Sequence, residues 1–410
     1  MRIAILSDLH AFCSDARKNS DGRKGPAPSL IDISAPSRTK SSDPLIGFTK
    51  LFENGEIDFP DLFIVAGDLG DKADTLAMRT VWNELVQLAA SQADVLLLAT
   101  CGNHDLDTRY QQNSFDPRGY LRTLNQNFPY PAANKYEINQ LEYWATNFSI
   151  LEHEAYRILN INSCAFHGFG SDAEPELEHG RISDITLGEI EERLRLSVQQ
   201  DPNKHNICLF HHHITPVSSD VFDDRSVMKG AERLTSMLSR AALGEWFIIH
   251  GHRHRSNLFH AGGNSGPIVL SCASFAATRT GDEHNPTPNQ FYILQFDVPQ
   301  SGKAARVSGS IEVWNWTPSI GWQSSASIPG GLPVETGFGF RGYIPDLADK
   351  IAADVRANMR LERSRLLCAF PEVGRLIPTD IDSLIATLEN QGLVVTQING
   401  RITEVVVANA

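Results

Sequence analysis

Short apolar runs recur along the first 250 positions, and most are followed at once by polar, chemically active side chains. The clearest runs are Arg2 to Leu6, Leu62 to Ala66, Val95 to Ala99, Asn206 to Phe210 and Glu245 to Ile249. Continuous apolar runs of this length predict strands that are covered on both faces. Apolar residues at helical spacing lie between some of them, as in residues 74–91, so the chain predicts an α/β fold with parallel strands.

The pattern changes after residue 255. Three β-type runs separated by Gly and Pro, at residues 268–272, 291–296 and 307–316, predict antiparallel strands that complete or flank the sheet. The expected larger domain spans residues 1–325, and a Gly- and Pro-rich linker, residues 326–345, follows it.

Residues 346–410 predict a small α+β domain. Apolar spacing indicates one helix at 347–370 and a second at 380–391, and Asn399-Gly400 divides two β-branched runs as a hairpin turn would. Helix, helix and hairpin resemble a winged helix, and a generic α+β appendage is the alternative.

Residues 11–44 form a polar insertion with several glycines, prolines and basic residues. Because this segment leaves directly after His10, it could act as a lid whose cations contact an anionic substrate. Those cations include Arg23, Lys24, Arg38 and Lys40. A solvated surface insertion is the alternative.

Five strand ends carry the candidate chemistry of the chain. In order they are Asp8-Leu9-His10, Gly67-Asp68, Gly102-Asn103-His104-Asp105, His211-His212-His213 and Gly251-His252-Arg253-His254. Ligands bind at the carboxyl ends of strands in α/β sheets, because side chains can converge there. One such element is explained by an ordinary turn, but five in succession predict a metal centre made of histidine and carboxylate.

This ordered set resembles the calcineurin-like metallophosphoesterase superfamily over roughly residues 1–320. The resemblance implies a four-layer α/β/β/α sandwich, here with the small C-terminal α+β appendage. It also implies two ligand sets that share one bridging carboxylate: Asp8, His10 and His254 for one metal, Asn103, His211 and His252 for the other, and Asp68 for both.

The implied ligands favour two divalent or trivalent transition-metal ions, manganese first, with iron, zinc or cobalt as alternatives. His104 stays outside the ligand set, and we expect it to protonate the leaving oxygen or stabilise charge, with Asp105 orienting it. In the triplet that begins at His211, the first histidine is the expected ligand and His212 is the open alternative. His250 is expected to be a buried core residue.

We therefore expect a dinuclear-metal phosphodiesterase acting on a small phosphodiester or a cyclic nucleotide through a metal-bridging hydroxide. The alternative is a nuclease acting on DNA or RNA, with the C-terminal domain contacting nucleic acid or a protein partner, or forming oligomers. The net charge of −13, from 36 basic and 49 acidic residues, disfavours nucleic-acid binding by bulk electrostatics. A non-catalytic scaffold is disfavoured because it has no use for His104.

The sequence also bears on the compartment of the protein. Its first residues read as a strand rather than as a signal peptide, and no apolar run is as long as a membrane span. Six scattered cysteines without paired spacing favour a reducing, cytoplasmic setting.

Overall fold

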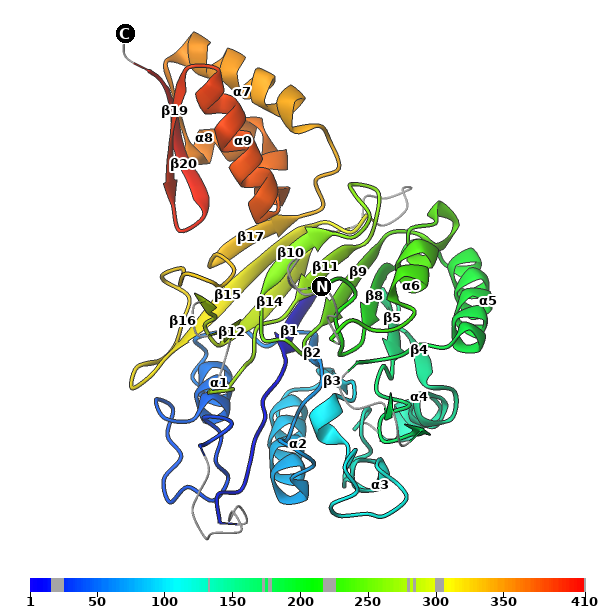
Figure 1. The fold of residues 1–410 in the computed structure, drawn as a ribbon. Coiled ribbons are helices and arrows are strands. Elements are labelled where there is room, and N and C mark those ends of the chain that lie inside the picture. Colours follow the sequence, from blue (N-terminus) through cyan, green and yellow to red (C-terminus); the bar gives the residue numbers. More distant parts are fainter. Residues whose placement is uncertain are drawn as a thin grey trace.

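The computed structural model describes residues 1–15, 26–131, 133–171, 174–175, 179–216, 226–278, 281–282, 285–298 and 306–408. Two mixed β-sheets form a large N-terminal domain, called here the two-sheet domain, and residues 344–408 form a small C-terminal domain above it (Figure 1). Two strand pairs, β6 (Gly170–Ser171) with β7 (Glu174–Pro175) and β12 (Gly281–Asp282) with β13 (Asn285–Pro286), lie outside the large sheets.

The first sheet has the strand order β16-β15-β14-β1-β2-β3, and β17 pairs with β15. Its strands are β1 (Arg2–Leu6), β2 (Leu62–Val65), β3 (Leu96–Ala99), β14 (Gln290–Phe296), β15 (Gly309–Thr317), β16 (Gly321–Gln323) and β17 (Glu335–Phe338). Strands β1, β2 and β3 are parallel, whereas β14 and β15 are antiparallel to their neighbours, as expected. Strand β17 occupies part of the expected linker, so this stretch belongs to the sheet.

The second sheet has the order β10-β11-β9-β8-β5-β4. Its strands are β4 (Phe148–Glu152), β5 (Tyr156–Ile161), β8 (His205–Leu209), β9 (Trp246–His250), β10 (Asn257–His260) and β11 (Ile268–Ser271). Strands β5, β8 and β9 are parallel to one another. The expectation for β11 was incomplete, because this strand is antiparallel to β10 but parallel to β9.

The two sheets pack face to face, and helices cover their outer faces, which gives four layers. In β8, Ile207 and Leu209 join the core shared with the first sheet, whereas Cys208 and Phe210 join a second core under helices α5 and α6. Successive side chains of a strand point to opposite faces, so a strand buried on both sides needs apolar residues at every position. The expected α/β/β/α sandwich is confirmed.

Helices cover the outer faces of the sandwich (Figure 1). Helices α1 (Pro44–Glu53) and α2 (Thr75–Ala90) pack on the first sheet, and α5 (Asp184–Gln200) and α6 (Ala231–Leu238) pack on the second. The remaining helical segments of this domain are η1 (Asn103–Asp105), α3 (Gly119–Arg122), α4 (Ala133–Thr146) and η2 (Ala241–Leu243). Within the described ranges, no helix is both long enough and apolar enough to cross a membrane.

The described parts of the insertion, residues 11–15 and 26–44, pack against the two-sheet domain. Arg38 is 2.6 Å from Asp43, which caps helix α1, and 2.5 Å from Glu84 of α2. These ion pairs correct the expectation that Arg38 contacts substrate, because its guanidinium is already held by two carboxylates. Arg23 and Lys24 lie outside the described residues.

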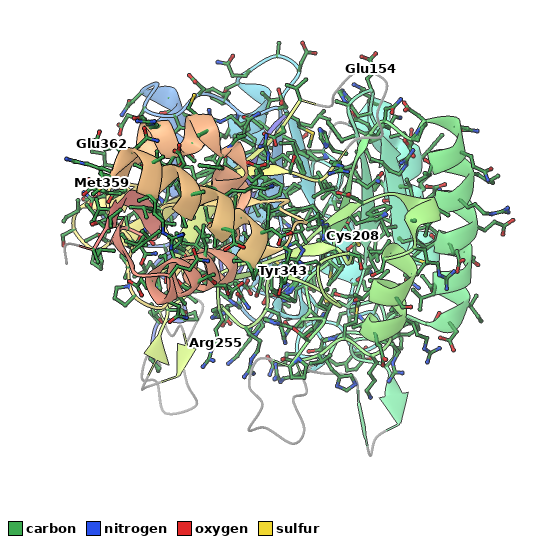
Figure 2. All side chains as sticks on the ribbon, turned by 90° about the horizontal axis from the view of Figure 1, so that it is seen from above. Glu154, Cys208, Arg255, Tyr343, Met359 and Glu362 are labelled. Carbon is green, nitrogen blue, oxygen red and sulfur yellow. The ribbon has the colours of Figure 1, made fainter. Side chains whose placement is uncertain are left out.

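The C-terminal domain consists of α7 (Ile344–Asn358), β18 (Arg360–Glu362), α8 (Arg363–Ala369), η3 (Pro371–Arg375), α9 (Pro378–Asn390), β19 (Leu393–Ile398) and β20 (Arg401–Val407). The expected single helix over 347–370 is wrong, because Met359 adopts a left-handed conformation (φ 69°) that ends α7 and starts β18. Tyr343 precedes α7 and Met359 follows it, and both side chains are exposed (Figure 2).

The β19–β20 hairpin turns at Asn399-Gly400, as expected, with positive φ at both residues. Its tip is fixed to the two-sheet domain: the Ser327 hydroxyl donates to the Asn399 carbonyl (3.2 Å), and the Asn399 side chain donates to the Ser325 carbonyl (3.2 Å). Ile377, before α9, packs in the core of the two-sheet domain. The two domains therefore share a packed interface rather than a free linker.

Candidate metal centre

Five strand-end loops converge at the carboxyl edges of the two sheets. Strands β1, β2 and β3 deliver residues from the first sheet, and β8 and β9 deliver residues from the second. Because these strands are parallel within each sheet, their carboxyl ends lie along one edge. The loops that the sequence singled out therefore meet in one place.

Asp8, His10 and His254 form the first group of donors. The Nε2 atoms of His10 and His254 are 2.9 Å apart, and Asp8 Oδ1 is 3.4 Å from His254 Nε2 and 3.8 Å from His10 Nε2. Ligand atoms bound about 2.0–2.2 Å from one ion lie about 2.9–3.6 Å from one another. The spacing of this group fits one metal ion.

A second group gathers around Asn103. Its Oδ1 atom is 3.1 Å from His211 Nε2 and 3.0 Å from His252 Nδ1. Asp68 Oδ2 is 3.3 Å from His211 Nε2 and 3.6 Å from His10 Nε2, so Asp68 lies between the two groups. The donor types and their spacing fit a second ion, with Asp68 in a bridging position.

Neighbouring polar groups orient several of these donors. Nδ1 of His211 lies 2.8 Å from the carbonyl of Ala66, which can only accept, so this nitrogen carries a proton and Nε2 is the ring atom directed at Asn103 and Asp68. Ser7 donates its hydroxyl to Asp8 Oδ2 (2.6 Å). Support of this kind, through the second ring nitrogen or the second carboxylate oxygen, is typical of metal ligands.

The backbone of the site is strained. Five of the seven expected ligands have positive φ although they are not glycine: Asp8 (55°), His10 (48°), Asp68 (56°), His252 (85°) and His254 (57°). Residues with side chains rarely adopt this conformation, and it persists where surrounding structure enforces it, as at functional sites. No pattern in the sequence predicts this strain.

Two motif glycines are required by close packing around the carboxylates. A Cβ atom at Gly102 would collide with the side chain and backbone of Asp68, and one at Gly251 would collide with the side chains of Ser7 and Asp8. Glycine therefore lets the loops after β3 and β9 approach the carboxylates closely.

Burial and charge set the protonation of the donors. Burial alone would raise the pKa of Asp68, but the nearby His211 and His104 outweigh it and hold the pKa well below its ordinary value. Burial, reinforced by His104, lowers the pKa of His10 to about 3, and burial with neighbouring histidines lowers the pKa of His252. Asp68, His10 and His252 are thus poised as a carboxylate and neutral imidazoles, which are the forms that bind metals. Burial alone would lower the pKa of His211, but Asp68 outweighs it and holds the pKa well above its ordinary value, so this imidazole must release a proton when it binds a metal.

His104 lies beside both donor groups. Its backbone N–H donates to Asp68 Oδ1 (2.8 Å), its ring contacts the His10 ring edge-on, and its side chain is 31% exposed. Nδ1 of His104 is 2.9 Å from Asp71 Oδ1. The sequence prediction missed Asp71, although this carboxylate follows Asp68 in the same strand-end loop.

Asp105 does not contact the His104 ring, which corrects its expected orienting role. Its carboxylate accepts three backbone N–H groups, from Asp68 (2.9 Å), Gly70 (3.2 Å) and Gly102 (2.9 Å). Burial, with the nearby Asp68, raises the pKa of Asp105 to about 7. Asp105 thus joins the loops after β2 and β3, and Asp71 takes the position beside His104.

The other histidines of the two clusters point elsewhere. His212 Nδ1 is 2.9 Å from the Ser163 hydroxyl, and His213 packs against His250 with ring centroids 4.5 Å apart. His250 is fully buried. Of the triplet, the structure places His211 among the expected donors.

Comparison with known families fits this geometry. The family model described as calcineurin-like phosphoesterase matches residues 1–256, more than half of the chain. The chain belongs to the calcineurin-like phosphoesterase family. A second family model, wHTH-Calcineurin_assc, matches residues 336–390 in this family member. No curated protein matches the chain significantly.

Solved structures similar to this phosphoesterase include a dimetal phosphatase from Danio rerio, with 12% identity and a TM-score of 0.45, covering 79% of this chain and 98% of that one. A purple acid phosphatase from yellow lupin (Lupinus luteus) seeds has 15% identity and a TM-score of 0.46, covering 83% of this chain and 53% of that one.

Proposed function

We propose that this phosphoesterase hydrolyses small phosphodiesters, cyclic nucleotides included, with two transition-metal ions held by the two donor groups. One observation carries the proposal: both groups converge on Asp68, and His104 stands next to them with its own carboxylate partner, Asp71. When bound, two such cations polarise a phosphoryl oxygen and supply a hydroxide nucleophile at neutral pH. Manganese is our first choice, with iron, zinc or cobalt as alternatives.

The side chains of the chain have separate tasks in this proposal. Asp8, His10 and His254 would hold one ion, Asn103, His211 and His252 the other, and Asp68 both. His104 would hold a proton on Nε2 for the leaving oxygen, while Asp71 accepts from Nδ1 and keeps the ring in place. Asp105 fixes the loops after β2 and β3, so that Asp68 and Asn103 keep their spacing.

The charge balance of the site favours a diester over a monoester. Among the described residues, the ion pairs of Asp8 and Asp68 are all with histidines. The charge of a bound phosphoryl group would therefore be balanced mainly by the metal ions. A diester carries one negative charge where a monoester carries up to two, so it needs less additional positive charge.

The surface of the C-terminal domain favours a small substrate over nucleic acid. The hairpin tip, which would be the wing of a winged helix, is packed on Ser325 and Ser327. The exposed side chains of α9 include Asp382 and Glu389, which would repel phosphates. A nuclease remains the second candidate, because a family model of the wHTH type matches this region.

A substrate panel tests the proposal. Protein stripped with a chelator and reloaded with Mn²⁺ should hydrolyse bis(p-nitrophenyl) phosphate and a cyclic nucleotide faster than p-nitrophenyl phosphate, single-stranded DNA or RNA. Turnover of the monoester alone would show that the substrates are phosphomonoesters. Preferential cleavage of DNA or RNA would favour the alternative of a nuclease. If the metal-saturated protein hydrolyses none of these esters, the proposal that it is a phosphoesterase is wrong.

We also propose a cytoplasmic, reducing location. All six cysteines are free thiols, and five of them are buried. Buried thiols in a fold of this size act as small apolar side chains, so the chain does not rely on an oxidising compartment for its stability.

A further inference from the structure

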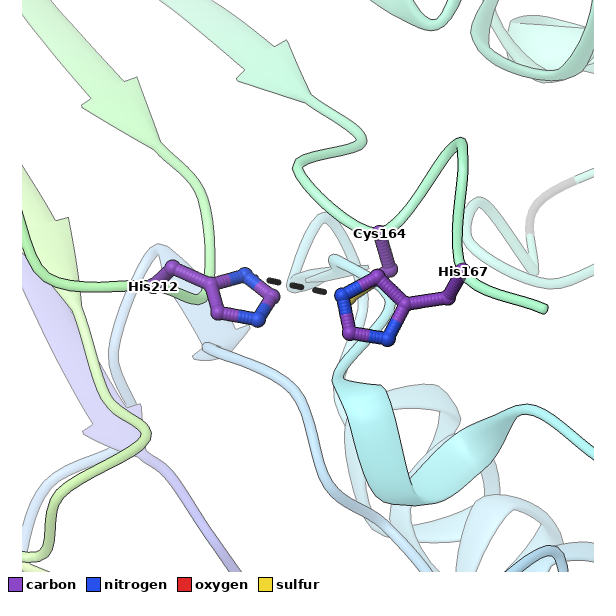
Figure 3. A group of neighbouring side chains, drawn as sticks. All are labelled: Cys164, His167 and His212. Atoms are coloured by element: carbon purple, nitrogen blue, oxygen red, sulfur yellow. Dashed lines mark hydrogen bonds between the residues drawn. The ribbon is translucent and has the colours of Figure 1, made fainter. Parts of the chain in front are cut away.

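A second cluster of metal-binding side chains lies beside the dinuclear centre. Cys164 and His167 follow strand β5, His212 follows β8, and all three are buried. One donor atom from each lies within 4.8 Å of the other two, and Cys164 Sγ is 4.0 Å from His212 Nδ1 (Figure 3). The residues of this cluster are separate from the seven expected ligands.

The His167 imidazole of the cluster has bonding capacity left over. Nε2 of His167 lies 3.0 Å from the carbonyl of His179, so it carries the proton, and the lone pair is on Nδ1. That Nδ1 is buried and has no hydrogen-bond partner among the described residues. Buried polar atoms without a partner are rare and call for an explanation such as an ion.

The chain makes room for this arrangement. A Cβ atom at Gly180 would collide with the His212 ring, so the absence of a side chain there lets the ring occupy its position. Ser163 also contacts His212 Nδ1 (2.9 Å) and supplies an oxygen next to the cluster. By contrast, the buried Cys208 lies in an apolar core, as an ordinary structural thiol does.

We propose that Cys164, His167 and His212 bind one Zn²⁺ ion, as a third metal besides the dinuclear pair. Zinc prefers thiolate and imidazole in tetrahedral geometry, with Zn–S about 2.3 Å and Zn–N about 2.0–2.1 Å, which places S and N about 3.5 Å apart. The observed 4.0 Å needs a contraction of a few tenths of an ångström. On binding, the Cys164 thiol releases its proton to solvent and the thiolate forms the Zn–S bond.

The fourth position of this zinc would be filled by water or by the Ser163 hydroxyl. The ion would tie the segment after β5 to the segment after β8, next to His211. Its proposed role is structural, because none of its three side chains is among the seven expected ligands of the dinuclear centre. The inference is independent of the substrate proposed above.

Cobalt substitution tests this site, because only a thiolate ligand gives a sulfur-to-cobalt charge-transfer absorption. Metal-free protein carrying Cys368→Ser, which removes the exposed thiol, is titrated with Co²⁺ under reducing conditions. The protein should bind three equivalents of Co²⁺ per chain. Only one of the three should contribute to the charge-transfer band. Adding Cys164→Ser should abolish the band and reduce zinc stoichiometry from three to two per chain, whereas adding Cys208→Ala should leave both unchanged.

Two results would overturn the proposal. The first is saturation with two Co²⁺ ions and no charge-transfer band, and the second is a band that survives Cys164→Ser. If Cys164→Ser does not fold, His167→Gln should lower the zinc stoichiometry from three to two per chain, and the titration of the Cys368→Ser protein tests the proposal without either variant. The readout is spectroscopic, so it does not depend on whether the enzyme turns over any ester.

Discussion

Nδ1 of His104 and Oδ1 of Asp71 lie 2.9 Å apart, and Asp71 is 5% exposed whereas His104 is 31% exposed. A buried carboxylate that accepts from one ring nitrogen fixes the tautomer and directs the other nitrogen outward. We therefore expect Nε2 of His104 to be the donor that faces substrate. This pair, rather than His104 with Asp105, is the acid unit that we propose for the site.

Asp71→Asn should lower kcat by about 10- to 100-fold while both metal ions stay bound, because the amide no longer stabilises the proton on the ring. His104→Ala should lower kcat by about 10²- to 10⁴-fold, also with both metals retained. Steady-state kinetics on a diester, with metal analysis of each protein, measures both effects.

The double variant decides whether the two residues act as a unit. If Asp71 acts through His104, Asp71→Asn should have little further effect on kcat in the His104→Ala background. Fully multiplicative losses would mean that Asp71 has an independent role. Loss of a metal ion in Asp71→Asn would contradict its assignment as a positioning residue.

Asp105→Asn should reduce both stability and metal occupancy. The carboxylate serves three backbone N–H groups on loops that carry Asp68 and Asn103, and an amide cannot accept from all three; we expect a loss of about 2–4 kcal/mol. Asp107 is a matched control, because it also accepts three backbone N–H groups, from residues 111–113. Asp107→Asn should lower Tm but leave the metal content unchanged. Equal metal loss in both variants would contradict the specific role of Asp105.

Chelation should lower the stability of the protein, and Mn²⁺ should restore it. Each ion present at about 100 times its Kd contributes about 2.7 kcal/mol to folding, so Tm should rise by several degrees on reloading. His211→Ala should bind one ion fewer than the parent chain. His153→Ala, which removes a ring stacked on Tyr156 away from the site, serves as the control and should bind the full complement. Unchanged metal content in His211→Ala would exclude His211 as a ligand.

The fold and the position of the site could be predicted because local sequence determines them directly. Apolar runs in β1, β8 and β9 indicate buried parallel strands, and the polar residues that follow must lie at one edge of their sheets. Asp8, His10 and Asp68 could thus be placed together before any distance was known. The Asn399-Gly400 turn was predictable for the same reason, because its backbone conformation is encoded in two adjacent residues.

What could not be predicted depends on contacts between distant segments. Asp71 and Asp105 are both strand-end carboxylates, and only the three-dimensional path of the loops decides which one meets His104. The break at Met359 lies inside a regular apolar spacing, so the sequence predicts a continuous helix there. The cluster of Cys164, His167 and His212 joins loops 45 residues apart, and no local spacing connects them.

A pair of glycines in the C-terminal domain tests whether the hairpin tip is held by the two-sheet domain. Gly400 (φ 81°) and Gly392 (φ 80°) have the same left-handed backbone conformation, but a Cβ atom would be 2.5 Å from Pro333 Cβ at Gly400 and would meet nothing within 4 Å at Gly392. Either glycine replaced by Ala should cost about 1 kcal/mol for the positive φ. Gly400→Ala should cost a further 1–3 kcal/mol or so, through overpacking, and should expose residues 326–334 to limited proteolysis. Equal Tm and equal protease resistance in the two variants would show that the tip does not depend on this contact.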